Sequence, residues 1–417
     1  MDRFIVRPGP PLEGSVRIGG AKNSALKLLA ATLLSEGEHV LHNVPRIADV
    51  ETMCDLLISM GVDVARRGET LTVRRWSDVT PEAPYELVER MRASVVVLGP
   101  LLACCGRAVV SMPGGDDFGS RPIDDHLRGL EQLGASFTFS HGVIEGRAEV
   151  LTGSRILLEV PSHTATDTLL MAAVKAKGTT VIENAAREPE VADLAAFLNR
   201  MGARIVGAGT STIEIEGVDE LSPCEHTVIP DRIEAATFLA AVAIAGGELT
   251  LEGAQPDHMD MLCRKLGDMG LRTSPTSTGL WACRTKRLSA VDVATLPYPG
   301  IATDYKPLLV AMLTVADGVG IVTENLYGAN RFRYVNELVR MGADIRLQGH
   351  HAVVRGVERL SGAPVKAHDL RAGAAVVLAG LAADGETVVS DAFHVERGYD
   401  DLAGKLRSVG ADVTIAH

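Results

Sequence analysis

The sequence predicts an α/β fold in two domains, each made of three copies of one helix–strand unit. Three observations support this prediction. The chain has 417 residues, which is more than a single hydrophobic core usually supports. A helix pattern that is rich in Ala and Leu and ends in glycine recurs six times. A run of β-branched or alternating residues follows each of these helices, as in half-buried strands.

Each repeat carries two glycines at nearly constant spacing. The first ends an apolar helix and the second ends an amphipathic helix. The pairs are Gly37 and Gly61, Gly106 and Gly134, Gly178 and Gly202, Gly247 and Gly270, Gly318 and Gly342, and Gly385 and Gly410. Glycine suits the left-handed position at which a helix ends, so these twelve residues are expected to have positive φ angles.

The repeats also indicate how the domains are divided. Three repeats fall on each side of a point near residue 230, and the strand expected over residues 3–17 precedes the first repeat and closes onto the C-terminal half. Helices such as 239–247 and 376–385 are apolar all round, which is typical of buried helices.

Composition excludes several classes of protein. The net charge of −12 argues against a general polyanion partner, and an aromatic content of 4% argues against stacking on single-stranded nucleic acid. The segment from Met1 to Gly20 lacks the apolar core of a signal peptide, and the apolar stretch 94–105 is too short to span a bilayer. The six cysteines lack metal-site spacing, as expected of free thiols in a reducing cytoplasm. We therefore expect a cytoplasmic protein with no nucleic acid, membrane, metal or cofactor partner.

Basic residues at turns next to helices are the candidate anion-binding groups, because glycine-rich turns and helix N-termini let backbone amides approach an anion. They are Lys22 in 19–24, Arg92 at the start of an apolar helix, Arg121 in the glycine-rich loop 112–122, Arg371 in 369–373 and Arg397 in 394–399.

Each of these residues also has a purely structural interpretation. The loop 112–122 could be a solvated acidic loop, and Asp369 could serve only as a helix N-cap. Arg397 could pair at the surface with Glu396 or Asp400. Asp304, at the start of the buried helix of the fifth repeat, is either another cap or an acid–base group.

Seven motifs together point to one known family. They are Gly-Gly-Ala-Lys-Asn (19–23), Met-Arg-Ala-Ser (91–94), Pro-Gly-Gly followed by Gly-Ser-Arg-Pro (113–122), Glu-Asn-Ala-Ala-Arg-Glu-Pro (183–189), Pro-Asp-Arg-Ile-Glu (230–234), Asp-Leu-Arg-Ala (369–372) and Arg-Gly-Tyr (397–399). With these motifs the chain resembles the UDP-N-acetylglucosamine 1-carboxyvinyltransferase (enolpyruvyl transferase) family over essentially its full length. The resemblance implies two inverse α/β domains, 22–229 and 1–21 plus 230–417, with the active site in the cleft between them.

The resemblance also implies a reaction. The enolpyruvyl group of phosphoenolpyruvate (PEP) is transferred to a hydroxyl of a uridine nucleotide by addition and elimination through a tetrahedral ketal, and phosphate is released. PEP is a compact trianion, so the reaction needs clustered cations. By resemblance, Lys22, Arg92 and Arg121 bind its phosphate and Arg371 and Arg397 its carboxylate. Asp304 is the general base, and the loop 112–122 is a lid that excludes water.

Position 116 departs from the family pattern. Most members have cysteine where this chain has Asp116, a residue thought to protonate C3 of PEP or to assist product release. The resemblance thus names Lys22, Asp116, Asp304 and Arg397 as catalytic. Fosfomycin is normally trapped by the thiolate at this position, so the substitution predicts resistance to it.

Further departures gather around the acceptor. The family usually has Val-Gly where this chain has His163 and Thr164, Phe-Pro where it has Ile301 and Ala302, and an apolar residue in place of Asp125; the segment 326–330 also carries one extra residue. The residues assigned to the acceptor by resemblance are Asn23, Arg121, Pro122, Ile123, Asp124, Asp125, Ser162, His163, Thr164, Asp304 and Tyr327.

These departures leave the acceptor open. The first candidate is the 3-hydroxyl of UDP-N-acetylglucosamine, as in peptidoglycan precursor synthesis. The second is UMP or another uridine nucleotide, as in nucleoside-antibiotic pathways. A third reading is a nucleotide-binding paralogue without turnover, which the retained Lys22, Asp304, Arg371 and Arg397 disfavour.

Overall fold

The computed structural model describes residues 2–112, 114, 123–327 and 329–416, which divide into two compact units. The first unit holds the described residues between 20 and 229, and the second holds residues 2–19 and 230–416 apart from 328. Within the described chain, each unit contains three four-stranded sheets. The predicted α/β class is confirmed in this respect.

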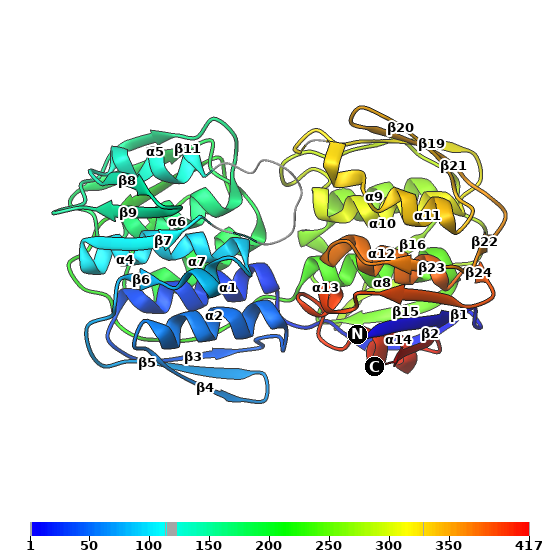
Figure 1. The fold of residues 1–417 in the computed structure, drawn as a ribbon, viewed down its shortest axis with the longest axis horizontal. Coiled ribbons are helices and arrows are strands. Elements are labelled where there is room, and N and C mark those ends of the chain that lie inside the picture. The colour runs from blue at the N-terminus through cyan, green and yellow to red at the C-terminus, as the bar shows by residue number, and fades with distance from the viewer. Residues whose placement is uncertain (1, 113, 115–122, 328, 417) are drawn as a thin grey trace. The chain divides into compact units, whose positions relative to one another are not determined.

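The first unit is built around three mostly buried helices: α1 (Lys22–Ala31), α4 (Leu98–Cys105) and α6 (His163–Ala173) (Figure 1). Amphipathic helices pack against them. Helix α2 (Ala48–Ser59) packs on α1, α5 (Asp124–Gln132) packs on α6, and α7 (Pro189–Arg200) packs on both α1 and α6. Shorter elements are η1 (Thr32–Leu34), α3 (Tyr85–Val88) and η2 (Arg92–Val97).

The three sheets of the first unit share one topology, in which a parallel edge pair is followed by two antiparallel pairings. Their orders are β14-β3-β5-β4, β6-β7-β9-β8 and β10-β11-β13-β12. The strands are β3 (Gly37–His42), β4 (Asp63–Arg67), β5 (Thr70–Arg75), β6 (Glu82–Ala83), β7 (Arg107–Ser111), β8 (Ser136–Ser140), β9 (Val143–Arg147), β10 (Arg155–Leu157), β11 (Thr179–Glu183), β12 (Arg204–Val206), β13 (Thr212–Glu216) and β14 (Glu225–Thr227).

The second unit repeats this plan. Its buried helices α8 (Arg232–Ala245), α10 (Lys306–Thr314) and α12 (Leu370–Gly380) pack against one another (Figure 1). Every residue of α10 and α12 is buried. The remaining helices are η3 (Pro256–His258), α9 (Asp260–Met269), η4 (Thr303–Tyr305), η5 (Ala329–Phe332), α11 (Val335–Arg340), α13 (Phe393–Glu396) and α14 (Leu402–Ser408).

The four-stranded sheets of the second unit have the orders β2-β15-β17-β16, β18-β19-β21-β20 and β23-β25-β1-β26, again with one parallel edge pair each. The strands are β1 (Arg3–Arg7), β2 (Leu12–Arg17), β15 (Gly247–Glu252), β16 (Arg272–Pro275), β17 (Gly279–Arg284), β18 (Val293–Ala294), β19 (Val319–Thr323), β20 (Asp344–Gln348), β21 (His351–Arg355), β23 (Pro364–Lys366), β25 (Thr387–Ser390) and β26 (Asp412–Ala416), with a separate pair β22 (Leu360–Ser361) and β24 (Ala383–Asp384).

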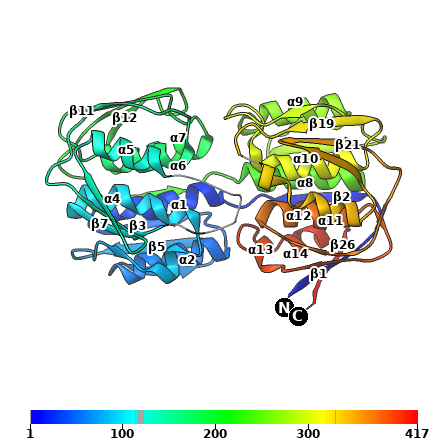
Figure 2. The same ribbon diagram turned by 45° about the horizontal axis from the view of Figure 1, so that its top comes forward.

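The prediction of a single strand over residues 3–17 is wrong in one respect. The segment forms two strands, β1 and β2, which join different sheets of the second unit. The residues between them are Pro8-Gly9-Pro10-Pro11, and proline cannot donate a ladder hydrogen bond, so the strand is interrupted there. β1 pairs antiparallel with both β25 and β26, which brings the two ends of the chain together (Figure 2).

The prediction for the repeat glycines is confirmed. All twelve have positive φ angles, between 64° and 113°. All six cysteines are free. No helix among the described residues has the length and apolar character needed to cross a membrane.

Two of these glycines give a matched test of packing against backbone strain. At Gly247 φ is +96°, and an added Cβ would lie 2.0 Å from the carbonyl oxygen of Leu12 in the paired strand β2. At Gly270 φ is +101° and the space around an added Cβ is open. We expect Gly270→Ala to lower the free energy of unfolding by about 1–3 kcal/mol through backbone strain alone. Gly247→Ala should cost at least about 1 kcal/mol more, because the strand pair must also separate.

Urea unfolding of both variants and the wild type measures the difference. Equal losses in the two variants would contradict the proposed close packing of β15 on β2.

Candidate functional site

In the first unit Lys22 is the first residue of α1 and is buried. Its Nζ atom lies 2.5 Å from Oδ2 of Asp49, in the first turn of α2. Asn23 follows it, and its carbonyl oxygen accepts a hydrogen bond from Nζ of Lys27 at 2.7 Å. The buried ammonium of Lys22 is therefore held in place at the N-terminal end of α1.

A buried polar chain fixes this end of α1. Ser24 donates its hydroxyl to Oδ2 of Asp193 on α7, whose Oδ1 lies 2.8 Å from Nε2 of His226. The amide of Ala21 donates to the carbonyl of Ile229 at 2.7 Å. The position of Lys22 thus depends on side chains from the opposite end of the same unit's sequence.

His126, on α5, is clamped by two hydroxyls of α6. Nδ1 lies 3.0 Å from Oγ1 of Thr168, and Nε2 lies 3.0 Å from Oγ1 of Thr164. Because Thr168 already donates its hydroxyl to the Thr164 carbonyl, it can only accept from Nδ1–H, so Nε2 accepts from Thr164. Burial, with a smaller contribution from Arg92, lowers the pKa of His126 to about 3 and keeps the ring neutral. The hydroxyl of Thr164 is therefore turned toward His126.

The first turn of α6 holds the other acceptor residues expected from the family. Ser162 is its N-cap and accepts from the amide of Ala165 at 3.4 Å. His163 Nε2 and Lys27 Nζ both lie 3.5 Å from Oδ2 of Asp167, which is completely buried. Burial raises the pKa of Asp167 to about 7, although Lys27 opposes this shift. His163 thus adds an imidazole beside an existing carboxylate–ammonium pair.

The other predicted residues of the first unit have varied positions. Arg92 begins η2, and Ile123 is buried at the start of α5. Asp124 is exposed, and Asp125 pairs with Arg128 of the same helix at 3.0 Å. Asp116, Arg121 and Pro122, and with them most of the loop 112–122, lie outside the described residues.

In the second unit Asp304 lies in η4, directly before α10. The interpretation of Asp304 as a helix cap does not hold, because neither η4 nor α10 has a side-chain cap. Instead its Oδ1 accepts from Nη2 of Arg331 at 2.7 Å, and the guanidinium of Arg331 lies 4.9 Å from the ring centroid of Tyr327. Asp304 and Tyr327, both predicted from the sequence, are thus joined by Arg331, which was not.

Arg371 is buried in the first turn of α12. Asp369 is the N-cap of this helix, as the sequence allowed, and accepts from the amides of Arg371 and Ala372 at 2.9 and 2.8 Å. Burial alone would lower the pKa of Arg371, but the Tyr399 oxygen and the carboxylates of Asp231 and Asp304 outweigh it and raise that pKa. Within the part of the chain that the structure describes, Nη1 of Arg371 has no hydrogen-bond partner.

Arg397 follows α13 and is half-buried. Tyr399, two residues further on, is buried, lies under the Arg371 guanidinium at 5.1 Å and shares a hydrogen bond of 2.8 Å with the hydroxyl of Thr237 on α8. The Arg-Gly-Tyr motif therefore bridges to α8 and α12 through its tyrosine.

Sequence reasoning missed Arg331, His126, Glu324 and Lys306. The last two form a fully buried ion pair at 2.8 Å beside Asp304. One signal was available for Lys306, since a lysine within a helix that is otherwise apolar needs a buried partner. The partners themselves come from distant segments, and no local pattern marks them.

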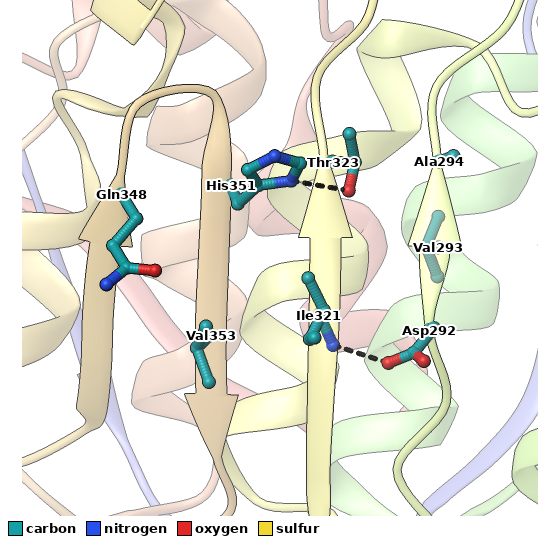
Figure 3. A pocket seen from close by; sticks show the side chains of 8 residues that line it. All are labelled: Asp292, Val293, Ala294, Ile321, Thr323, Gln348, His351 and Val353. Carbon is teal, nitrogen blue, oxygen red and sulfur yellow. Dashed lines mark hydrogen bonds between the residues drawn. The ribbon is translucent and has the colours of Figure 1, made fainter.

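The second unit also has a hollow of about 550 Å³ on the outer surface of the sheet β18-β19-β21-β20 (Figure 3). Asp292, Ile321, Gln348 and His351 line it, and Asp292 accepts from the amide of Ile321 at 2.8 Å. None of the predicted site residues contributes to its lining, so the hollow is separate from the residues discussed above.

Comparison with known proteins assigns this fold to a class of enzymes. The family model described as EPSP synthase (3-phosphoshikimate 1-carboxyvinyltransferase) matches residues 6–406. The enolpyruvyl transferase NikO from Streptomyces tendae has a TM-score of 0.89 at 26% identity, covering 100% of this chain and 99% of its own. An EPSP synthase from Acinetobacter baumannii shares the fold with a TM-score of 0.76 at 17% identity. The protein is an enolpyruvyl transferase, and the predicted fold is confirmed.

Sequence relatives identify the family within this class. UDP-N-acetylglucosamine 1-carboxyvinyltransferase 1 of Caldanaerobacter subterraneus is 50% identical over 412 residues, 99% of each chain. The Mycobacterium tuberculosis enzyme of the same name is 48% identical over 99% of this chain and 98% of its own. The chain belongs to the UDP-N-acetylglucosamine 1-carboxyvinyltransferase family.

The clamp on His126 predicts a pH dependence of stability. Below pH 6.5 the unfolded chain protonates this residue, whereas the folded protein keeps it neutral until about pH 3. The unfolded state then binds more protons, so His126 lowers the free energy of unfolding by about 1.4 kcal/mol for each pH unit below 6.5. In His126→Asn this contribution is absent, and the loss of stability between pH 6 and pH 4 should be shallower.

Urea unfolding at several pH values measures this slope. The exposed His141, at a turn with positive φ that asparagine tolerates, provides the control His141→Asn, which should keep the wild-type slope. A wild-type slope in His126→Asn would show that His126 is not the buried neutral group.

Proposed function

We propose that this protein transfers the enolpyruvyl group of PEP to the 3-hydroxyl of UDP-N-acetylglucosamine, with release of phosphate, as a step in peptidoglycan precursor synthesis. The observation that carries the proposal is Arg371, a buried guanidinium whose Nη1 has no partner among the described residues. A buried arginine with an unused donor is suited to binding an anion, and a carboxylate matches the geometry of its guanidinium.

The other cations fit the same substrate. We propose that Lys22, Arg92 and Arg121 neutralise the PEP phosphate and that Arg397 joins Arg371 at the carboxylate. The buried Lys22 supports this assignment, because its single charge lies at the start of a helix whose N-terminus also favours anions.

Asp304 is the proposed general base. Its carboxylate would take the proton of the acceptor hydroxyl as that oxygen attacks C2 of PEP, while C3 of PEP receives a proton. Loss of a proton from C3 then expels phosphate and restores the double bond. The guanidinium of Arg331 at 2.7 Å supports the role, because it stabilises the ionised carboxylate that a base requires.

The relatives favour UDP-N-acetylglucosamine as the acceptor, since two that are named for it are 50% and 48% identical over 99% of this chain. The hydroxyl of Thr164, one of the departures from the family pattern, is held by His126. Transfer to UMP or another uridine nucleotide remains the alternative, which His163 at the same helix end keeps open. The free cysteines support a cytoplasmic location.

Phosphate release with each acceptor tests the proposal. With PEP and UDP-N-acetylglucosamine we expect continuous release of phosphate and a product heavier by the enolpyruvyl group. Release of phosphate with UMP alone would show that UMP, and not UDP-N-acetylglucosamine, is the acceptor. Release with neither would support the interpretation as a nucleotide-binding paralogue without turnover.

Replacing Arg371 tests the PEP site. In Arg371→Met we expect kcat/KM for PEP to fall about 30-fold or more, because removal of one partner of a buried charge pair costs at least about 2 kcal/mol. Arg359→Met is a matched control, because Arg359 is an exposed arginine of the same unit that pairs with Asp384 at the surface. Steady-state kinetics at varied PEP concentration measure kcat/KM for both variants. A loss of similar size in Arg359→Met would contradict the assignment of Arg371 to PEP binding.

Fosfomycin tests the consequence of Asp116. The wild type should keep its activity after incubation with the drug, because a carboxylate replaces the thiolate that opens the epoxide. Asp116→Cys should become sensitive and gain the mass of one fosfomycin molecule. A covalent adduct on Asp116 in the wild type would contradict the expectation.

A further inference from the structure

We propose that Glu324 is a positioning residue of this site: its buried carboxylate joins the turn that carries Asp304 to the loop that carries Tyr327 and Arg331, with Lys306 as its counter-charge. The inference rests on the proposed function, in which Asp304 is the base. All of these residues belong to the second unit.

The first of the two segments that Glu324 joins is the loop after β19. Oε1 of Glu324 accepts three hydrogen bonds, from the hydroxyl of Thr295 at 2.8 Å and from the amides of Leu326 and Tyr327 at 2.9 and 3.2 Å. The amide of Asn325 also donates to Thr295, at 2.9 Å. Leu326 is exposed and Tyr327 half-buried, so these hydrogen bonds, rather than packing, fix the start of the loop.

The second of these segments is the turn that carries the base. Oε2 of Glu324 accepts from the hydroxyl of Thr303 at 2.7 Å and forms an ion pair with Nζ of Lys306 at 2.8 Å. Thr303 directly precedes Asp304, and Lys306 lies two residues after it. One carboxylate therefore holds both sides of η4.

The loop and the turn meet a second time at the base itself. Arg331 ends the loop and donates to Asp304 at 2.7 Å, with its guanidinium over the ring of Tyr327. Since Glu324 fixes the beginning of the loop and the turn together, the geometry of the Arg331–Asp304 pair depends on it. A small displacement of η4 would move the Asp304 carboxylate away from the acceptor hydroxyl whose proton it takes.

The charge balance explains why the carboxylate needs a lysine. The side chains of Glu324 and Lys306 are both completely buried, and the Lys306 ammonium lies 4.0 Å from the ring centroid of Phe332. Burial lowers the pKa of Lys306 to about 8 although Glu324 opposes this shift, and Arg331 and Asp369 are the other charges acting on it. Because the two groups form a fully buried ion pair at 2.8 Å, removal of either member alone leaves the other as a buried charge without its partner.

Thr303 offers the most specific test, because its hydroxyl joins the turn to Glu324 without carrying charge. In Thr303→Val, of nearly the same shape, we expect kcat to fall about tenfold while KM for PEP stays within about twofold, because the anion-binding groups are untouched. Thr303→Ser keeps the hydroxyl and should recover most of the lost kcat. A merely structural contact would change stability without this division between kcat and KM.

Removal of the charge gives the second test. Glu324→Gln should lower both kcat and the melting temperature, because it leaves the Lys306 ammonium without its partner. The double variant Glu324→Gln/Lys306→Met removes that buried charge, so the melting temperature should recover while kcat stays low. Glu337→Gln is the matched control, because Glu337 is a buried glutamate of the same unit that binds His368 and the amide of Lys366 instead.

The outcomes distinguish a failure of the positioning role of Glu324 from a failure of the proposed function. If the wild type releases phosphate and Thr303→Val matches it, or if kcat returns together with stability in the double variant, the positioning role is overturned and the proposed function stands. If the wild type releases no phosphate with either acceptor, the proposed function fails and this inference fails with it.

Discussion

The burial of six apolar helices determines where polar chemistry can occur in this protein. A helix that is surrounded by protein on every side can present functional groups only at its ends. The candidate residues follow this rule: Lys22, His163, Asp304 and Arg371 all lie at or directly before the N-terminus of such a helix. The helix dipole there is positive, which suits a reaction whose donor and acceptor are both anions. The repeated unit thus provides several similar helix ends, which differ in the side chains that they carry.

The same constraint explains how an acidic chain can serve a trianionic substrate. The net charge of −12 is a sum over the whole chain, whereas three of its cations are buried and each forms an ion pair with one carboxylate. Lys22 has Asp49, Lys306 has Glu324 and Arg331 has Asp304. Arg371 differs, because its Nη1 is unused within the described chain. A buried cation with an unused hydrogen-bond donor is a better indicator of an anion-binding position than the net charge of the chain.

Local patterns were enough to predict the repeats, the positive φ of the glycines and the capping role of Asp369, because each depends on a few neighbouring residues. The division of the N-terminal segment into two strands was not predicted, although Pro8, Pro10 and Pro11 indicate an interruption there. Arg331, Glu324 and His126 were missed for another reason: their partners lie in other segments of the chain, and only the packed structure brings them together.

The pairing of β1 with β25 and β26 has a consequence for synthesis on the ribosome. The first unit is nearly continuous in sequence and can fold while the rest of the chain is still being made. Strand β1 has no such opportunity, because both of its neighbours, β25 and β26, come from the C-terminal part of the chain. It therefore stays unpaired until β25 and β26 have been made, and Pro8, Pro10 and Pro11 in the turn after it cannot donate ladder hydrogen bonds to another strand in the meantime.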